Sequence, residues 1–233
     1  MPDHDHAHDH NHVLGVVLAG GQGRRMGFVD KPLINLGAPA AQKELSHSQH
    51  ERDETILAHI LERLEAQTPR IIINANAALE QYSRYGVEVV PDYIDGYLGP
   101  LSGVLTGLDW AAMNTGFTHV MTVPGDAPFI PRDMTAKMIA ALNKGQDSRA
   151  DDAAVLVRAS SNGRAHPVVG LWPVSIRARL RDALVNEDVR KIDRFTAEFP
   201  MEDVDFAGVP DPFFNINTDD DVAMAKRILA QRG

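Results

Sequence analysis

A cluster of glycines and cations follows the first apolar run of the chain. This run, Val13–Leu18, has the length and β-branched content of a strand that is buried on both faces. Gly20 and Gly21 come next, and glycine permits backbone angles that let main-chain N–H groups approach an anion closely. Arg25 and Lys31 add positive charge a short distance further on. The pattern predicts a phosphate-binding loop at the C-terminal edge of an open α/β sheet.

Two common glycine-loop motifs do not fit this segment. A dinucleotide fingerprint needs G-x-G-x-x-G, but after Gly21 and Gly23 the next glycine is Gly27, one residue too late. A Walker A loop needs a Lys-Ser or Lys-Thr pair after its glycines, and none follows here. For the glycine pair taken alone, an ordinary strand-to-helix turn with solvated arginines stays open as the alternative.

A carboxylate follows a later apolar run. Residues 119–123 predict a strand, and Asp126 comes after them in a turn stiffened by Pro124 and Pro128. A carboxylate presented beside a phosphate loop is a hard oxygen ligand of the kind that Mg²⁺ prefers. Taken alone, Asp126 is typical of a turn; together with the glycine loop, it predicts a metal ligand.

Two more polar residues come at the ends of predicted strands. Asn74 ends the strand predicted for residues 70–74, and Asp92 follows the one predicted for residues 87–90. Ligand-contacting residues in open α/β sheets lie at such strand ends. Each residue by itself is more typical of a turn.

The second half of the chain adds a hairpin and a pair of amides. Asn162 and Gly163 form a strong hairpin signal, which predicts an antiparallel strand after the turn. His166 lies on that strand, and both a structural hydrogen bond and a substrate contact stay open for it. Asn215 and Asn217 alternate along an extended segment, so both amides can face one cleft.

Four separated motifs resemble those of the molybdenum cofactor guanylyltransferases. The first is Leu-Ala-Gly-Gly-x-x-x-Arg-Met-Gly-x-x-x-Lys, which ends at Lys31. The others are Gly-Pro-Leu-x-Gly from Gly99 to Gly103, the His-Pro pair at His166, and Asn-x-Asn-Thr from Asn215 onward. The cytidylyltransferase relatives usually carry Leu-Ala-Ala-Gly in the first motif, so the Gly-Gly pair here favours guanine.

The resemblance implies both a fold and an activity. The implied fold is a three-layer α/β/α Rossmann-like nucleotidyltransferase fold, whose sheet is mostly parallel with an antiparallel edge. The implied activity is transfer of GMP from Mg-GTP to the phosphate of molybdopterin, which bears molybdenum in the cell, with release of pyrophosphate. Mg²⁺ is the implied cofactor, and other proteins of molybdenum cofactor synthesis and insertion are candidate partners.

The resemblance also implies a role for each candidate residue. The implied catalytic residues are Arg25, Lys31 and Asp126, with Asp126 as the metal ligand. The implied nucleotide-binding residues are Leu18, Ala19, Gly20, Gly21, Lys31, Asn74, Asp92 and Asp126. The implied acceptor-binding residues are Gly99, Gly103, His166, Asn215 and Asn217.

Length and composition are those of an ordinary globular domain. The chain has 233 residues, of which 44% are hydrophobic and 24% charged, and this is enough to bury a core. Its net charge of −9 argues against a surface that binds nucleic acid duplexes. It has no cysteine, which excludes disulfides and thiolate metal sites. With no apolar run near the ~20 residues of a membrane span and no secretory signal pattern, we expect a cytoplasmic protein.

The predicted domain starts after a histidine-rich tail. Residues 1–12 carry almost no apolar side chains and predict a disordered tail, whereas the resemblance implies a single nucleotidyltransferase domain over residues 13–233. Residues 38–54 are polar without periodicity, and the resemblance implies that they are an inserted surface loop. The nearby His59 is expected to be solvated.

Apolar spacing predicts the remaining elements. We expect helices near residues 55–64, 78–85, 100–113, 134–142, 174–184 and 188–195, a helix after Thr218, an extended segment at residues 32–37, and a strand at residues 153–157.

Three other functions stay open on the sequence. The nearest is a molybdopterin cytidylyltransferase or a sugar-nucleotide transferase on the same fold. One of another class is a non-catalytic regulator that binds nucleotides. The third is metal handling by the histidine-rich tail, because imidazoles and carboxylates are competent ligands.

Overall fold

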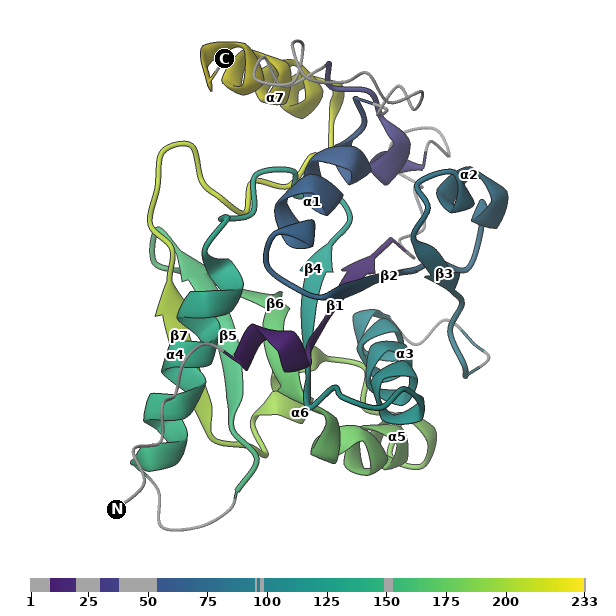
Figure 1. Ribbon diagram of the computed structural model, residues 1–233, viewed down its shortest axis with the longest axis vertical. Helices are drawn as coiled ribbons and strands as arrows, with labels where there is room; N and C mark the ends of the chain where they lie inside the picture. The colour runs from purple at the N-terminus through teal and green to yellow at the C-terminus, as the bar shows by residue number, and fades with distance from the viewer. Residues whose placement is uncertain are drawn as a thin grey trace.

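A seven-stranded sheet lies at the centre of the molecule. The computed structural model describes residues 9–19, 30–37, 54–94, 96, 99–148 and 153–232. Within this part of the chain the strand order is β3-β2-β1-β4-β6-β5-β7 (Figure 1). The strands are β1 Val13–Leu18, β2 Arg70–Asn74, β3 Glu88–Val90, β4 His119–Pro124, β5 Leu156–Ser161, β6 Arg164–Pro173 and β7 Met201–Asp205.

One strand of this sheet runs against the others. The pairs β1–β2, β1–β4, β2–β3 and β5–β7 are parallel, whereas β6 is antiparallel to both of its neighbours, β4 and β5. The mostly parallel sheet is therefore confirmed. The reversed strand lies inside the sheet, because β5 and β7 extend the sheet beyond it.

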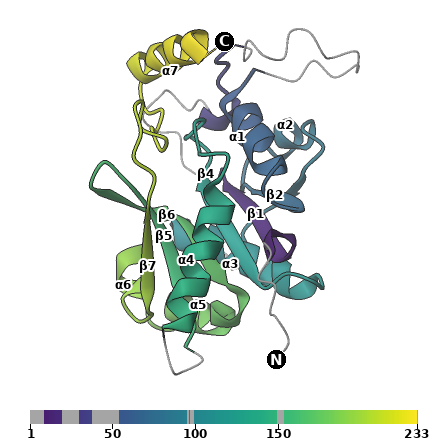
Figure 2. The same cartoon turned by 60° about the vertical axis from the view of Figure 1, so that its left-hand side comes forward.

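Helices cover both faces and make three layers (Figure 2). One apolar cluster packs side chains of α1 and α4 on the first face and includes side chains of α7, which lies beyond the ends of the strands; a second packs side chains of α3, α5 and α6 on the other face. Among the described residues, none of the helices combines the length and apolar character that crossing a bilayer requires. The helices are α1 Ile56–Glu65, α2 Leu79–Ser83, α3 Pro100–Met113, α4 Met134–Asp147, α5 Arg177–Val185, α6 Ile192–Thr196 and α7 Asp219–Arg232.

Most predicted elements are present, and the differences have local causes. The segment predicted as extended at residues 32–37 begins instead with a 3₁₀ turn, Lys31–Leu33, which has Pro32 in its first turn. The helix predicted at residues 134–142 continues to Asp147. It runs through Lys144 and Gly145, whose composition is typical of a loop.

The strands at the far edge of the sheet were the least predictable. The strand expected at residues 153–157 is β5, which starts later and ends at Ser161. Its second half alternates buried and half-buried residues, so the apolar run alone misplaced it. The sequence did not predict β7, whose residues are Met-Glu-Asp-Val-Asp. It pairs only with β5, and acidic side chains are common on such edge strands.

His59 is buried, so the prediction that it is solvated is wrong. The side chain lies on the inner face of α1 and is 4% exposed. Its Nε2 is 3.2 Å from the carbonyl oxygen of Gly37, and burial lowers the pKa of the imidazole.

The C-terminal end of the predicted histidine-rich tail forms a 3₁₀ turn, Asp9–His12. The carbonyl oxygen of His12 accepts a hydrogen bond from the N–H of Thr118. Residues 1–8 and 38–53 lie outside the described residues.

A bulge interrupts the pairing of β5 with β6. Arg158 is opposite Gly170, but the next residue, Ala159, is opposite His166, so residues 167–169 of β6 have no partner on β5. Pro167 has no N–H to pair, which fits this position. The free carbonyl of Val168 accepts a hydrogen bond of 2.6 Å from the hydroxyl of Thr122 on β4.

The Thr122 hydroxyl holds the bulge from the buried side. It also accepts a hydrogen bond of 2.8 Å from the indole Nε1 of Trp172, and Thr122 is fully buried.

We expect Thr122→Val to lower the free energy of unfolding by about 2 to 4 kcal/mol, because the carbonyl of Val168 and the indole of Trp172 both lose a buried hydrogen bond. Urea unfolding measures the loss. A double-mutant cycle with Trp172→Phe tests whether the two side chains are coupled. If the losses of unfolding free energy in the two single variants add up in the double variant, the coupling is contradicted.

Candidate functional site

The C-terminal ends of β1, β2 and β4 meet at one edge of the sheet. Leu18 is level with Asn74 on one side and with Pro124 on the other. The N–H of Ala19 donates to the carbonyl of Asn74 at 2.8 Å, and the N–H of Gly125 donates to that of Leu18 at 3.0 Å. The residues that follow these three strands are therefore neighbours.

A lysine, a carboxylate and an amide meet at this edge. Lys31 Nζ donates to Asn217 Oδ1 at 2.7 Å and lies 3.6 Å from Asp126 Oδ2. Lys31 begins a 3₁₀ turn, Asp126 follows β4, and Asn217 precedes α7, so three distant parts of the sequence contribute. The N–H of Ile216 donates to the main-chain carbonyl of Asp126 at 2.9 Å, which fixes the segment that carries the amide. Three predicted site residues are thus brought together.

The Asp126 carboxylate is partly removed from water. Its side chain is 24% exposed and that of Lys31 is 18% exposed. Burial raises the pKa of Asp126, while the charge and hydrogen bond of Lys31 oppose the rise. A half-buried carboxylate of this kind is stabilised by any further cation that approaches it.

The donor set fits a divalent metal that is shared with a substrate. In the parts of the chain that the structure describes, no group of three or more His, Cys, Asp or Glu side chains could hold a metal ion. Mg²⁺ is commonly bound by one or two carboxylates together with substrate phosphates and water. Asp126 offers one such carboxylate, so phosphate oxygens would complete the coordination.

The residue before Lys31 is anchored to α2. The phenol of Tyr82 donates to Asp30 Oδ1 at 2.6 Å, and Tyr82 is fully buried. Burial raises the pKa of both groups. This bond ties the start of the 3₁₀ turn to the body of the protein and so restricts where Lys31 can lie.

Asn74 and Asp92 form a second polar group beside the first. Asn74 Nδ2 donates to Asp92 Oδ1 at 2.9 Å and to the carbonyl of Val90 at 3.1 Å. Asp92 Oδ2 accepts from Asn76 Nδ2 at 2.9 Å and from the hydroxyl of Ser102 at 2.8 Å. Asn76 Oδ1 also accepts from the N–H of Asp92 at 2.8 Å. The Asp92 carboxylate is therefore held from three sides.

Of the two predicted acceptor-side glycines, Gly103 is buried beneath the site. A Cβ added to it would lie 2.4 Å from Asn74 Oδ1 and 2.7 Å from a methyl carbon of Leu18. Gly103 lets α3 approach the strand ends closely, and its predicted contact with the acceptor stays a prediction. Gly99 differs, because it caps α3 with a φ of +77° and precedes Pro100.

The reversed strand brings His166 to the same edge of the sheet. Gly170 of β6 is level with Thr122 of β4, and β4 ends two residues later, so the residues of β6 before Val168 extend past the C-terminal end of β4. His166 Nε2 lies 2.6 Å from the hydroxyl oxygen of Ser161, and its ring centroid lies 4.7 Å from that of Phe213. Asn215, two residues after Phe213, is exposed.

The structure describes only the start of the predicted phosphate loop. Gly20, Gly21 and Arg25 lie outside the described residues, so their roles stay predictions. Leu18 and Ala19 lead into the loop and lie at the edge described above.

Comparison with known proteins decides the family. A family model described as the MobA-like NTP transferase domain matches residues 15–200. A protein named molybdenum cofactor guanylyltransferase from Bradyrhizobium sp. (strain ORS 278) is 42% identical over 220 residues, which cover 94% of this chain and 93% of that protein. This chain belongs to the MobA-like NTP transferase family. It is therefore a nucleotidyltransferase, as the first glycine motif predicted.

Solved structures agree with this MobA-like fold. Molybdopterin-guanine dinucleotide biosynthesis protein A from Archaeoglobus fulgidus has a TM-score of 0.66 and 20% identity, over 94% of this chain and 99% of that one. Rv0371c from Mycobacterium tuberculosis H37Rv, in complex with manganese, has a TM-score of 0.60 and 15% identity, over 93% and 99% of the two chains. At these identities the likeness establishes the fold alone.

The sequence missed the residues that hold the site residues in place. Asn76 and Ser102 contact the predicted site residue Asp92, and Tyr82 contacts Asp30, the residue before Lys31. None of the three was a candidate site residue. The signal available for Asn76 was its position two residues after a strand end. For Tyr82 it was a large aromatic residue in a short, mostly polar helix.

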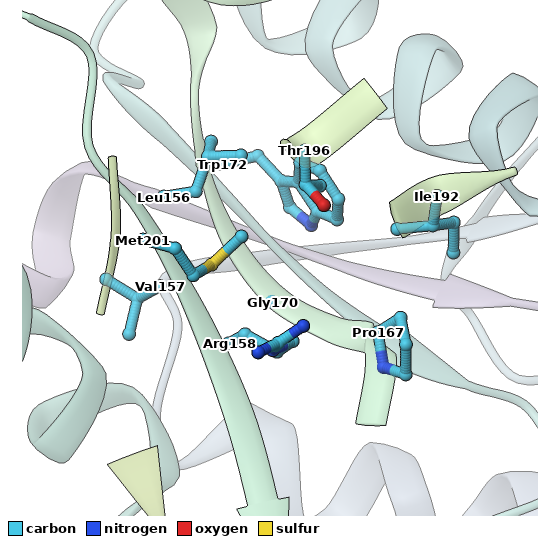
Figure 3. Close-up of a pocket in the computed structure, with 9 residues that line it drawn as sticks. All are labelled: Leu156, Val157, Arg158, Pro167, Gly170, Trp172, Ile192, Thr196 and Met201. Atoms are coloured by element: carbon cyan, nitrogen blue, oxygen red, sulfur yellow. The ribbon is translucent and has the colours of Figure 1, made fainter. Parts of the chain in front are cut away.

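A small cavity lies elsewhere in the MobA-like domain and is separate from this site. Figure 3 shows it between β5, β6 and α6, next to the bulge at Pro167. None of the predicted site residues lines it. The lining residues are Leu156, Val157, Arg158, Pro167, Gly170, Trp172, Ile192, Thr196 and Met201.

The close packing of Gly103 gives a test of the Asn74–Asp92 group. We expect Gly103→Ala to displace the Asn74 amide and to raise the KM for the nucleotide about tenfold, the scale of one lost hydrogen bond. Steady-state kinetics measure the change. Gly107→Ala is the control, because the atoms nearest to its Cβ would be side-chain carbons of Val16 and Val120 and not of Asn74. Equal KM values in both variants would contradict the expectation.

Proposed function

We propose that this MobA-like nucleotidyltransferase transfers GMP from Mg-GTP to the phosphate of molybdopterin and releases pyrophosphate. Relatives named molybdenum cofactor guanylyltransferase, at 42% and 39% identity over nearly the whole chain, support this substrate pair. The observation that supports the proposal is the meeting of Lys31, Asp126 and Asn217 at the edge where β1 ends, just before the predicted phosphate loop in the sequence.

The reaction poses a problem of charge more than of proton transfer. An oxygen of the acceptor phosphate forms a bond to the α-phosphorus of GTP, and the bond from that phosphorus to the bridging oxygen of pyrophosphate breaks. Both reactants are anions, so the protein must neutralise charge and align the groups in line. The acceptor phosphate is largely ionised near neutral pH, since its second pKa is about 6. No strong general base is needed.

The triphosphate is assigned to the loop and its cations. Main-chain N–H groups from Leu18 to Gly21 would hold the phosphates, and Arg25 and Lys31 would neutralise them and the charge that develops on pyrophosphate. Asp126 would hold Mg²⁺ together with phosphate oxygens. When bound, the metal supplies Lewis-acid stabilisation of the phosphate charge. The manganese in the complex of Rv0371c is consistent with a divalent ion at this fold.

The nucleoside and the acceptor are assigned to the two flanking groups. Asn74 and Asp92 are proposed to bind the guanine nucleoside, and three donors keep the Asp92 carboxylate in one orientation. Gly99, His166, Asn215 and Asn217 are proposed to face the acceptor. Asn217 connects the proposed acceptor side with the proposed triphosphate side, because its amide oxygen accepts a hydrogen bond from Lys31.

Pyrophosphate release with each of the four nucleoside triphosphates tests the proposal. We expect release with GTP only, and only when molybdopterin is present. Turnover with CTP would instead indicate a cytidylyltransferase, and turnover with a sugar phosphate would indicate a sugar-nucleotide transferase. Binding of GTP without release under any condition would indicate a non-catalytic regulator.

The paired charges give a second test. We expect Lys31→Ala and Asp126→Ala each to lower guanylyl transfer on the order of 10²-fold, the scale of losing one preorganised electrostatic contact. Lys137→Ala and Asp133→Ala are matched controls, because these two residues form an exposed ion pair at the start of α4. Near-normal turnover in either site variant would remove that residue from the mechanism.

A further inference from the structure

Three polar side chains from separate segments meet behind the acceptor side. Ser161 ends β5, His166 lies on β6, and Asp211 lies in the segment that leads to Asn215 and Asn217. The hydroxyl of Ser161 donates to Asp211 Oδ1 at 2.8 Å, and its oxygen lies 2.6 Å from His166 Nε2. Ser161 is fully buried, so water cannot replace either partner.

The Asp211 carboxylate is kept ionised. Burial raises its pKa, but hydrogen bonds from the N–H of Phe213 and the hydroxyl of Ser161 oppose burial, and the pKa of Asp211 is lowered from its ordinary value. One of these donors is the N–H of Phe213, at 2.9 Å from Oδ1. An ionised carboxylate only accepts hydrogen bonds, so the single proton of the Ser161 hydroxyl points at Asp211.

The proton count then settles the state of His166. Because the Ser161 proton is used, Ser161 can only accept from the imidazole, so Nε2 must carry a proton. Burial lowers the pKa of His166; Asp211 opposes this, and Arg164, at the start of the same strand, adds to it. The ring is therefore neutral at neutral pH, and its other nitrogen, Nδ1, keeps a lone pair.

The ring is also held in place by its neighbours. Phe213 is buried, and its ring lies 4.7 Å from that of His166 and 5.6 Å from that of Phe206. The bulge that begins at Pro167 turns the strand directly after His166. Bulges commonly redirect a side chain next to an active site.

We propose that Ser161 and Asp211 are positioning residues that lock His166 in its Nε2–H tautomer, so that Nδ1 accepts a hydrogen bond from an N–H donor of the acceptor's heterocycle. The identity of the acceptor rests on the proposed function above. A pterin ring carries amide and amino N–H donors, whereas an ionised phosphate carries only acceptors. A neutral imidazole whose Nδ1 has no hydrogen-bond partner among the described residues therefore selects the heterocycle over the phosphate.

The path of the chain supports this orientation of the acceptor. The segment that starts at Asp211, beside His166, ends at Asn217, which accepts from Lys31. One end of the segment lies beside the neutral imidazole of His166, which can accept a hydrogen bond, and the other end lies beside the cation Lys31. This arrangement matches a ligand with a heterocycle at one end and a phosphate at the other. The phosphate is then placed toward Lys31, where the transfer is proposed to occur.

Nitrogen NMR of ¹⁵N-histidine protein tests the lock directly, without any turnover. We expect the His166 signals of the Nε2–H tautomer, and a shift of Nδ1 when a free pterin without phosphate is added. Inorganic phosphate should leave Nδ1 unchanged. An Nδ1–H tautomer in the native protein, or a response of Nδ1 to phosphate and not to pterin, would overturn the proposal. These readouts stand even if guanylyl transfer is absent, so they separate this proposal from the proposed function.

Variants of Ser161 test the functional consequence. We expect Ser161→Ala to mix the two tautomers and to raise the KM for the acceptor about tenfold while leaving the KM for GTP unchanged. Ser161→Thr keeps the hydroxyl and should restore the acceptor KM. Ser160→Ala is the matched control, because Ser160 makes only long contacts, of 3.4 Å, with β7. An equal rise in both KM values would indicate general damage and contradict the positioning role.

Protonation gives a further readout of the same lock. Below its pKa, His166 carries protons on both nitrogens and Nδ1 can no longer accept, so pterin affinity should fall as the pH drops through that pKa. The charged groups that bear on the ring are Asp211 from the C-terminal segment and Arg164 from β6. Because Asp211 raises the pKa of His166, Asp211→Asn should move the fall to lower pH. A fall at an unchanged or higher pH would contradict the assignment.

Discussion

The contact of Lys31 with Asp126 and Asn217 is the interaction on which the arrangement of this site depends. A half-buried cation needs compensation, and the protein supplies it from two segments that lie far from Lys31 in the sequence. The parallel strands make this possible, since their register puts the ends of β1, β2 and β4 at one level. The fold thus creates a place where opposite charges are held close together but are not fully neutralised by one another.

Carboxylates elsewhere at this edge follow a common principle. Asp92 and Asp211 each accept hydrogen bonds from at least two other residues, and the donors come from different elements of the fold. Their orientation is set before any ligand arrives, so little reorganisation is needed on binding. This edge of the sheet is therefore built from groups with fixed directions, and the surrounding donors determine its structure as much as the residues of the motifs do.

The sequence predicted what is encoded locally and missed what depends on distant pairing. The apolar runs located β1 and β2, and the turn at Asn162 and Gly163 located the hairpin, because each signal lies within a few residues. The acidic strand β7 and the buried His59 were missed, since only their partners in space, β5 and Gly37, explain them. The motif residues Asn74 and Asp92 were found as separate strand ends. Their contact through the Asn74 amide required the structure.

The direction of β6 explains how the hairpin of β5 and β6 contributes a residue to this edge of the sheet. In a parallel sheet the residues before each strand lie at the edge opposite to the ligand. Because β6 runs the other way, its early residues extend past the end of β4 and reach the same edge as Asp126. The bulge at residues 167–169 then separates the regular pairing near Gly170 from the segment around His166. The hydroxyl of Thr122 donates to the carbonyl that the bulge leaves without a strand partner, so this buried backbone group is not left without a hydrogen bond. A single antiparallel strand thereby adds an imidazole to an edge that the parallel strands supply with carboxylates and amides.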